Sequence, residues 1–298
     1  IRVMKKWIQA MRLRTLPLAA SCILTGAAAA KTDGHFNALI LALTLITTFI
    51  LQVLSNLAND YGDFSHGVDN ERRVGPARSM QSGLISQQQM KRALVITTAL
   101  SLAFGIALLW IVFSQQARFL EAILMLTLGI GAIAAAIKYT VGKNPYGYRG
   151  LGDVFVFLFF GPVGVLGTYF LLSGDIAFHT LLLASTIGLY STAVLNLNNL
   201  RDHENDRTMG KRTLVVWMGF RNGKIYQSLL VTIGTLCLLI WIWLHSSESL
   251  TMLALLPAGL QCFLLLNMWR TEKPAALDSE LKKVALLTFA VSLFLVLA

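Results

Sequence analysis

The sequence contains few charged residues and few cysteines. Asp, Glu, Lys and Arg together make up 13% of its 298 residues, about half the share found in an average soluble domain. Its three cysteines, Cys22, Cys237 and Cys262, lie in apolar stretches without paired spacing, which favours small buried side chains over disulfides or a thiolate metal site. Hydrophobic residues account for 55% of the chain. This balance excludes an ordinary soluble domain.

The apolar residues are gathered in long runs. The hydrocarbon core of a bilayer is about 30 Å thick, and a helix needs roughly 20 mostly apolar residues to span it. Nine runs approach this length, at about 15–31, 38–58, 93–114, 119–137, 153–173, 178–199, 227–245, 250–268 and 284–298. Because lipid offers backbone polar groups no partner, spanning segments are helices. We therefore expect an all-α, polytopic membrane helical bundle with nine transmembrane helices, forming one integral-membrane domain over residues 1–298.

The basic residues lie in alternate loops. All of the 25 Lys and Arg residues except Lys31 and Arg118 precede the first run or follow the second, fourth, sixth and eighth. The positive-inside rule places those loops and the N-terminus in the cytoplasm and the C-terminus on the opposite side. The predicted location is the inner (cytoplasmic) membrane of a bacterium, with several crossings. The net charge of +10 is distributed between loops rather than over one soluble face, so it indicates the lipid bilayer and not nucleic acid as a partner.

The carboxylates gather at the predicted cytoplasmic ends of two apolar runs. Each cluster begins with an Asn-Leu-x-Asn pattern and continues with carboxylates within a turn or so of helix. The first comprises Asn56, Asn59, Asp60, Asp63 and Asp69, and the second comprises Asn196, Asn198, Asn199, Asp202 and Asp206. Residues three or four apart share one face of a helix. Two such faces turned toward each other would line one cavity with oxygen-rich side chains.

These residue types are suited to magnesium and a diphosphate. Mg²⁺ prefers oxygen ligands and is usually completed by substrate phosphates. Cationic side chains follow each cluster or lie close to one, namely Arg72, Arg73, Arg78, Lys138, Lys211 and Arg212. Magnesium and Lys or Arg side chains can together hold a diphosphate leaving group while an allylic C–O bond ionises. The pattern therefore predicts a site for an allylic diphosphate.

Other interpretations of the same residues remain open. An Asp at a helix end can be a cap or a solvated charge, and Asn56, Asn59, Asn198 and Asn199 could form hydrogen bonds between helices. A divalent-cation or anion transporter could also use such carboxylates. Transporters usually bind their ions near the midplane of the bilayer, whereas these acids gather at one end with cations beside them, which favours the diphosphate site.

At these residues the sequence resembles the UbiA-type intramembrane aromatic prenyltransferases. Asn59, Asp60 and Asp63 match the first N-D-x-x-D signature of that family, with Asp69 in place of its usual last Asp. Asp202 and Asp206, followed by Gly210, Arg212 and Thr213, match the second signature. Shorter matches occur at 14–17, 75–78, 138–140 and 145–153. The N-D-Y-x-D-x-x-x-G-x-D spacing is similar to that of the branch that uses 1,4-dihydroxy-2-naphthoate.

The resemblance implies an enzyme that joins a polyprenyl diphosphate to 1,4-dihydroxy-2-naphthoate with loss of CO₂, giving demethylmenaquinone for menaquinone biosynthesis. It also leaves open a relative with another acceptor, such as 4-hydroxybenzoate, haem or a glycerol lipid. The implied Mg²⁺ ligands are Asn59, Asp60, Asp63, Asp69, Asp202 and Asp206. The implied diphosphate contacts are Asn56, Arg78, Lys138, Asn199, Lys211 and Arg212. The implied acceptor contacts are Arg14, Tyr146, Tyr148 and Arg149. The group expected to act in catalysis comprises Asp60, Asp63, Asp202, Asp206, Lys138 and Tyr139, with the rings of Tyr139 and Tyr146 facing the allylic cation.

Overall fold

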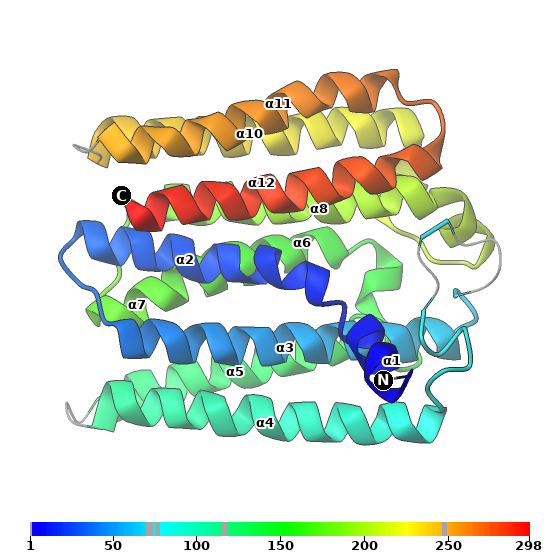
Figure 1. Ribbon diagram of the computed structural model, residues 1–298, viewed down its shortest axis with the longest axis horizontal. Helices are drawn as coiled ribbons and strands as arrows, with labels where there is room; N and C mark the ends of the chain where they lie inside the picture. The colour runs from blue at the N-terminus through cyan, green and yellow to red at the C-terminus, as the bar shows by residue number, and fades with distance from the viewer. Residues whose placement is uncertain (1, 70–73, 76–77, 115–117, 246–248) are drawn as a thin grey trace.

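The computed structural model describes residues 2–69, 74–75, 78–114, 118–245 and 249–298, and within these ranges the regular secondary structure is entirely helical (Figure 1). Two of the residues expected to act as cations at the site, Arg72 and Arg73, lie outside the described residues.

Seven long helices and one interrupted segment form most of the bundle. The long helices are α2 (Leu16–Thr32), α3 (Ala38–Ser65), α4 (Gln87–Phe113), α5 (Phe119–Lys138), α8 (Thr180–Thr208), α10 (Phe220–His245) and α12 (Leu277–Leu297). The interrupted segment consists of α6 (Gly152–Leu158), η4 (Phe159–Leu166) and α7 (Gly167–Ser173). Shorter elements are α1 (Arg2–Met11), η1 (Leu13–Thr15), η3 (Tyr146–Arg149), α9 (Leu214–Met218), η5 (Ser249–Ala254), α11 (Leu255–Arg270) and η6 (Pro274–Ala276).

The expected spans are all helical. Among the described residues, eight helical segments are long and apolar enough to cross a membrane. The ninth expected span lies in α12, which carries Glu280, Lys282 and Lys283 in its first two turns. Length and composition alone therefore do not confirm the count of nine. Large apolar side chains such as Trp110, Phe178 and Trp243 are strongly exposed on the outside of the bundle, as expected for surfaces that face lipid.

Helix α8 lies at the centre of the packing. It contacts α2, α6, α10 and α12, and its residues Leu183, Ile187 and Tyr190 are completely buried in the largest apolar cluster. Figure 1 shows α10 and α11 along one side of the bundle and α3, α4 and α5 along the other.

Local sequence signals define several helix ends and one irregular segment. The Asn37 side chain accepts hydrogen bonds from the backbone at the start of α3, and Ser86 and Gln89 form a capping box at the start of α4. In η4 the chain widens into a π-helix around Pro162, which has no N–H to donate. Gly161 in the same segment lies so close to the Ala184 backbone that a Cβ would overlap it. This segment therefore packs tightly against α8.

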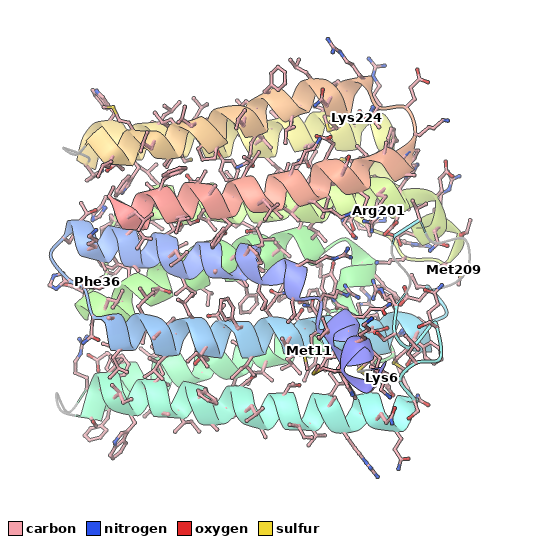
Figure 2. All side chains as sticks on the ribbon, viewed as in Figure 1. Lys6, Met11, Phe36, Arg201, Met209 and Lys224 are labelled. Carbon is pink, nitrogen blue, oxygen red and sulfur yellow. The ribbon has the colours of Figure 1, made fainter. Side chains whose placement is uncertain are left out.

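The two acidic helix ends lie at the same end of the bundle. Figure 2 shows Lys6, Arg201 and Lys224 toward this end and Phe36 toward the other. The N-terminal helix α1 crosses the end with the basic residues, and the C-terminus lies at the opposite end (Figure 1). This arrangement agrees with the alternation of basic loops in the sequence.

Candidate active site

The first acidic cluster lies on the last turns of α3. Asp60 and Asp63 are buried, with exposed fractions of 1% and 2%. Between them, Gly62 packs against Thr140 after α5, where any Cβ would overlap the threonine. The Thr140 hydroxyl donates to the Ala58 carbonyl at 3.0 Å. A glycine at this position thus lets α5 approach the acidic face of α3.

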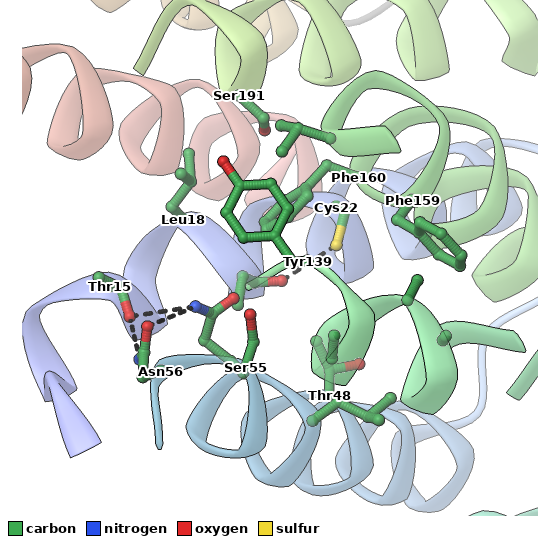
Figure 3. A pocket seen from close by; sticks show the side chains of 18 of the residues that line it. Thr15, Leu18, Cys22, Thr48, Ser55, Asn56, Tyr139, Phe159, Phe160 and Ser191 are labelled. Atoms are coloured by element: carbon green, nitrogen blue, oxygen red, sulfur yellow. Dashed lines mark hydrogen bonds between the residues drawn. The ribbon is translucent and has the colours of Figure 1, made fainter. Parts of the chain in front are cut away.

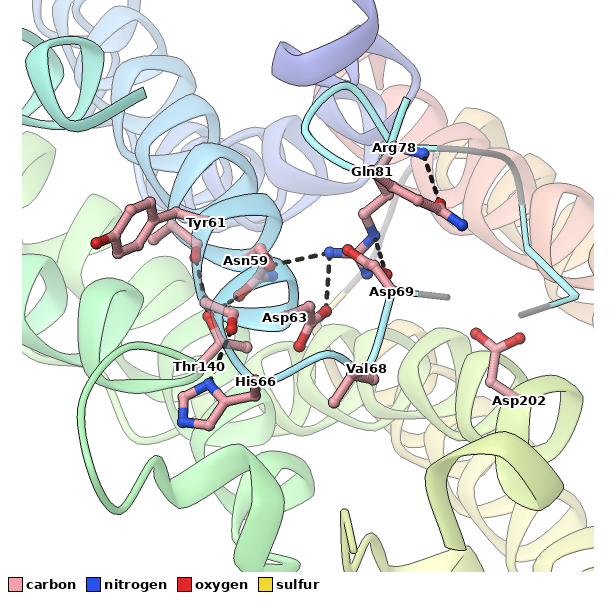
Figure 4. Close-up of polar contacts among 12 residues, drawn as sticks. Asn59, Tyr61, Asp63, His66, Val68, Asp69, Arg78, Gln81, Thr140 and Asp202 are labelled. Atoms are coloured by element: carbon pink, nitrogen blue, oxygen red, sulfur yellow. Dashed lines mark hydrogen bonds and ion pairs between the residues drawn. The ribbon is translucent and has the colours of Figure 1, made fainter. Parts of the chain in front are cut away.

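The loop after α3 folds back over this cluster and brings Arg78 between two carboxylates (Figure 4). Arg78 Nη1 lies 2.8 Å from Asp63 Oδ2, and its Nε lies 3.2 Å from Asp69 Oδ1. The same Nη1 donates to the Asn59 carbonyl at 3.0 Å. On its other side, Asp63 accepts a hydrogen bond of 2.6 Å from the Tyr148 hydroxyl. The planar guanidinium group thereby joins the loop to the helix that it covers.

The second cluster lies on the last turns of α8 and is also paired with cations. Asp202 accepts two hydrogen bonds from Arg201, at 2.9 Å from Nε and 2.6 Å from Nη2. Asp206 Oδ1 lies 3.7 Å from Lys211 Nζ. The buried Asn205 side chain donates to the Val68 carbonyl at 3.1 Å. This last bond joins the two clusters, because Val68 belongs to the loop that follows α3.

The cations in the loops are stabilised in their charged forms. Burial alone would lower the pKa of the Arg78 guanidinium, but Asp63 and Asp69 outweigh burial and raise that pKa above its usual value. Burial likewise opposes the charge of Lys211, and Asp206 and Asp63 reverse the effect and raise the pKa of Lys211. Burial and the charge of Asp63 raise the pKa of the Tyr148 hydroxyl, which keeps it protonated as a donor to Asp63.

A deep cavity of about 1120 Å³ begins beside these groups. Asn56 and Asp63 line its polar end, and Leu108 is among the apolar residues of its wall. Figure 3 shows Asn56, Cys22 and Phe159 around the cavity. This volume slightly exceeds the range of about 300–1,000 Å³ for pockets that hold drug-sized ligands. A long apolar molecule with one charged end matches this distribution of side chains.

Many of the residues predicted from the sequence line this cavity. Those that do so are Arg14, Asn56, Asn59, Asp60, Asp63, Arg78, Tyr139, Tyr146 and Lys211. Tyr139 projects into the cavity (Figure 3), and its ring contacts that of Tyr146 edge to face at 5.3 Å between centroids. The Asn56 amide donates to the Met11 carbonyl at 2.8 Å and to the Thr15 hydroxyl at 2.9 Å. Asn56 therefore also ties α3 to the N-terminal segment.

Other predicted residues are not brought to the cavity wall. The exposed Lys138, Arg149 and Arg212 are not among the described residues that line it. The predicted metal ligands Asp69, Asp202 and Asp206 are buried and do not line it either. Tyr148 lies behind Asp63, as its hydrogen bond requires, and Asn199 is buried within the bundle. Asn196 donates to the Gly223 carbonyl at 3.0 Å and to Gln227 Oε1 at 2.9 Å. Asn196, the first residue of the second Asn-Leu-x-Asn pattern, therefore forms hydrogen bonds between α8 and α10.

Four charged residues at the cavity were not predicted as site residues. Arg12, Arg201, Asp278 and Lys282 all line it. Arg12 has a left-handed backbone conformation, with φ of 49°, at the bend between α1 and η1. From the sequence, Arg12, Arg201 and Lys282 are expected only as basic residues of the loops on the cytoplasmic side. The adjacency of Arg201 to Asp202 was the one signal that could have indicated a local ion pair.

The oxygen-rich side chains are suited to a hard divalent cation. Asp60 Oδ1 and Asn199 Oδ1 are buried and have no hydrogen-bond partner among the described residues. Buried oxygens of this kind are costly unless they are bound, and carboxylate and amide oxygens are what Mg²⁺ prefers. In the described part of the chain, no group of three or more His, Cys, Asp or Glu side chains is close enough to form a metal site. The donor types therefore suit magnesium, but the described side chains do not form a complete site by themselves, so a substrate would have to supply further ligands.

The helical bundle and its acidic cavity define an intramembrane prenyltransferase. Residues 19–295 match the model of the UbiA prenyltransferase family, and the chain belongs to that family. It is 47% identical over 232 residues to 1,4-dihydroxy-2-naphthoate octaprenyltransferase of Escherichia coli (strain K12). The aligned region covers 78% of this chain and 74% of the relative. The enzyme of the same name from Haemophilus influenzae is 46% identical over 79% of this chain and 76% of the relative.

Solved structures share the fold at low sequence identity. A UbiA homolog from Archaeoglobus fulgidus bound to GPP and Mg²⁺ superposes with a TM-score of 0.65 at 16% identity, covering 98% of this chain and 100% of that one. The apo structure of a UbiA homolog from Aeropyrum pernix K1 gives a TM-score of 0.66 at 15% identity, with 96% of each chain covered. The expected fold is therefore confirmed.

Proposed function

We propose that this chain transfers a polyprenyl group from a polyprenyl diphosphate to 1,4-dihydroxy-2-naphthoate. The naphthoate loses CO₂, diphosphate is released, and the product is demethylmenaquinone in its reduced form, an intermediate of menaquinone biosynthesis. The observation that carries the proposal is the position of the α3 carboxylates Asp60 and Asp63, with Arg78 and Lys211, at the polar end of a deep apolar cavity. Lys211 connects this end to the second cluster through its ion pair with Asp206 of α8. Similarity to curated naphthoate prenyltransferases supports the choice of acceptor.

The diphosphate end of the substrate binds where the two clusters meet. Asn59, Asp60, Asp63, Asp202 and Asp206 are the residues that would hold Mg²⁺, with Asp69 held beside them by Arg78. Bound Mg²⁺ would supply neutralisation of the diphosphate charge. Arg78 and Lys211 line the cavity beside these carboxylates and donate hydrogen bonds to the diphosphate oxygens. Donors that are fixed before reaction stabilise the charge that develops on the leaving group.

The prenyl end of the substrate binds in the apolar part of the cavity. Ionisation of the allylic C–O bond creates a cation, and aromatic faces stabilise cations. Tyr139 and Tyr146 supply such faces, since Tyr146 is stacked on Phe155 with centroids 4.1 Å apart and donates its hydroxyl to the Ala135 carbonyl. The electron-rich naphthoate ring attacks the cation, so no nucleophile from the protein is required. Arg14, which lines the cavity near its polar end, is the proposed contact for the acceptor carboxylate.

The site faces the cytoplasm in this proposal. The basic loops, the acidic clusters and α1 lie at one end of the bundle, and cytoplasmic loops are the ones enriched in Lys and Arg. The C-terminus then lies on the other side of the inner membrane of a bacterium. This orientation brings the polar end of the cavity to the side on which water-soluble diphosphate is released.

Reconstituted protein tests the reaction directly. Purified chain in liposomes is incubated with farnesyl diphosphate, Mg²⁺ and equal concentrations of 1,4-dihydroxy-2-naphthoate and 4-hydroxybenzoate, and the products are identified by mass spectrometry. We expect a prenylated, decarboxylated naphthoquinone that disappears when EDTA is added. Prenylation of 4-hydroxybenzoate alone would retain the family and reject the acceptor. No product from either acceptor would reject the proposed function.

A further inference from the structure

A continuous chain of ion pairs connects the second acidic cluster to α12. Arg201 binds Asp202 through Nε and Nη2, and its Nη1 lies 2.6 Å from Asp278 Oδ1 on α12. Asp278 Oδ2 in turn lies 2.6 Å from Lys282 Nζ. A further bond of 2.8 Å runs from Arg201 Nη2 to Asn198 Oδ1. Arg201 therefore has two carboxylate partners on two different helices.

Arg201 competes with any metal ion for Asp202. Both oxygens of Asp202 accept hydrogen bonds from Arg201, and the Arg201 side chain is only 3% exposed. A buried guanidinium group that loses its sole counter-charge is strongly destabilised. If Asp202 were the sole carboxylate on Arg201, binding of a cation by Asp202 would leave Arg201 unpaired. The bond to Asp278 removes this difficulty because it remains when Asp202 changes partner.

We propose that Asp278 is a positioning residue that neutralises Arg201 and so allows Asp202 to bind the divalent cation. The inference rests on the proposed function, in which Asp202 is a metal ligand. Asp278 lines the cavity, but the role assigned to it here is exerted through Arg201 and requires no contact of its own with the metal ion. Helix α12 thereby contributes to metal binding although it carries none of the proposed metal ligands.

A neighbouring carboxylate on α12 provides a matched control. Glu280 is two residues from Asp278, and its Oε1 lies 2.7 Å from Lys283 of its own helix. Its pairing with Lys283 is local to α12 and does not involve Arg201. Neutralising Glu280 therefore changes the charge of α12 by the same amount as neutralising Asp278 and leaves the Arg201 pair intact.

The test measures metal binding in the full chain, independent of turnover. Protein in lipid nanodiscs is titrated with Mn²⁺ in place of Mg²⁺, with and without inorganic diphosphate, and free Mn²⁺ is measured by electron paramagnetic resonance. In the presence of diphosphate, Asp278→Asn should weaken Mn²⁺ binding by about tenfold or more, the effect of losing one hydrogen bond to a charged group. Asp278→Glu retains the charge and should bind Mn²⁺ more tightly than Asp278→Asn does. Glu280→Gln should bind Mn²⁺ as the wild type does.

A double variant separates positioning from general damage. In Arg201→Gln/Asp278→Asn the competing guanidinium is absent, so Mn²⁺ should bind more tightly than to Asp278→Asn alone, whereas a purely structural role predicts further weakening. Equal Mn²⁺ affinity in Asp278→Asn and Glu280→Gln, or no recovery in the double variant, would overturn the inference. If the wild type binds Mn²⁺ in the presence of diphosphate but the variants show neither effect, the inference about Asp278 is wrong and the proposed function stands. A wild-type chain that binds no Mn²⁺ under any condition contradicts both.

Discussion

Replacing Arg78 by Met should impair both stability and activity, because this side chain holds together three parts of the site. It contacts Asp63 Oδ2 at 2.8 Å, Asp69 Oδ1 at 3.2 Å and the Asn59 carbonyl at 3.0 Å. The exposed fractions of the three side chains are 10% for Arg78, 3% for Asp63 and 0% for Asp69. Removal of one member of a buried ion pair costs about 3–5 kcal/mol, a large part of the 5–15 kcal/mol that stabilises a typical protein.

The same substitution removes a proposed donor to the diphosphate. A hydrogen bond to a charged group contributes about 1.5–3 kcal/mol, which corresponds to roughly a 10- to 100-fold loss in kcat/KM for farnesyl diphosphate. Arg78→Lys should be intermediate, since a single ammonium group cannot bridge Asp63 and Asp69 as the planar guanidinium does. Both effects can be measured on protein in liposomes, as kcat/KM by product mass spectrometry and as the midpoint of thermal unfolding.

An arginine at the other end of the bundle serves as the control. Arg118 pairs with Glu121 at 2.9 Å, and both side chains are partly exposed, at 27% and 31%. Such a surface pair contributes about 0–1 kcal/mol, so Arg118→Met should leave kcat/KM unchanged and lower the unfolding midpoint slightly. A wild-type kcat/KM in Arg78→Met, or a change in its stability no larger than that of Arg118→Met, would contradict the role assigned to Arg78.

Three further predictions concern the cavity, Tyr148 and the opposite end of the bundle. Gly129 lines the cavity and faces open space. A phenylalanine ring in Gly129→Phe would occupy this space, so the variant should shift products toward shorter prenyl tails in a mixed-substrate assay. Gly131 lies on the exposed face of α5, so Gly131→Phe should leave the product distribution unchanged. Tyr148→Phe removes the 2.6 Å bond to Asp63 and should lower kcat/KM for the prenyl diphosphate by about tenfold; an unchanged value would mean that this bond does not position the carboxylate. Burial raises the pKa of the Asp33 carboxyl group, but hydrogen bonds from Tyr169 and His179 outweigh burial and lower that pKa. The stability that Asp33 contributes should therefore be present above pH 4 and lost as the pH falls further. The unfolding midpoint of Asp33→Asn should accordingly lie below that of the wild type at pH 7, with unchanged activity, and this difference should shrink as the pH falls below 4. A difference that stays constant or grows as the pH is lowered would contradict this assignment.

The membrane helices could be predicted from the sequence because long apolar runs leave few alternatives. Their ends were less certain. The run at 38–58 continues as helix to Ser65, and the run at 178–199 continues to Thr208. A helix needs no lipid to continue, so polar residues extend α3 and α8 beyond the apolar window. The π-helical turn around Pro162 could not be predicted, since it depends on how η4 packs against α8.

The acidic clusters could be predicted because residue type and spacing determine which side chains share a helix face. The direction of neighbouring side chains depends on helix rotation, which the sequence does not specify. Tyr139 lines the cavity, whereas the adjacent Lys138 is exposed, because successive residues of a helix point about 100° apart. The Arg201–Asp278 pair joins residues 77 positions apart, and only the packing of α12 against α8 brings them together.

In the proposed function, the carboxylates of α3 and α8 act together on one prenyl diphosphate. Single-turnover formation of the prenylated naphthoquinone, at saturating Mg²⁺ and farnesyl diphosphate, tests it most directly in Asp63→Asn and Asp202→Asn. Glu204→Gln is the control, because Glu204 lies on α8 near Asp202 but is exposed. We expect each Asp variant to lower the rate by about 100-fold or more and the Glu204 variant to react as the wild type does. A wild-type rate in either Asp variant would contradict the account.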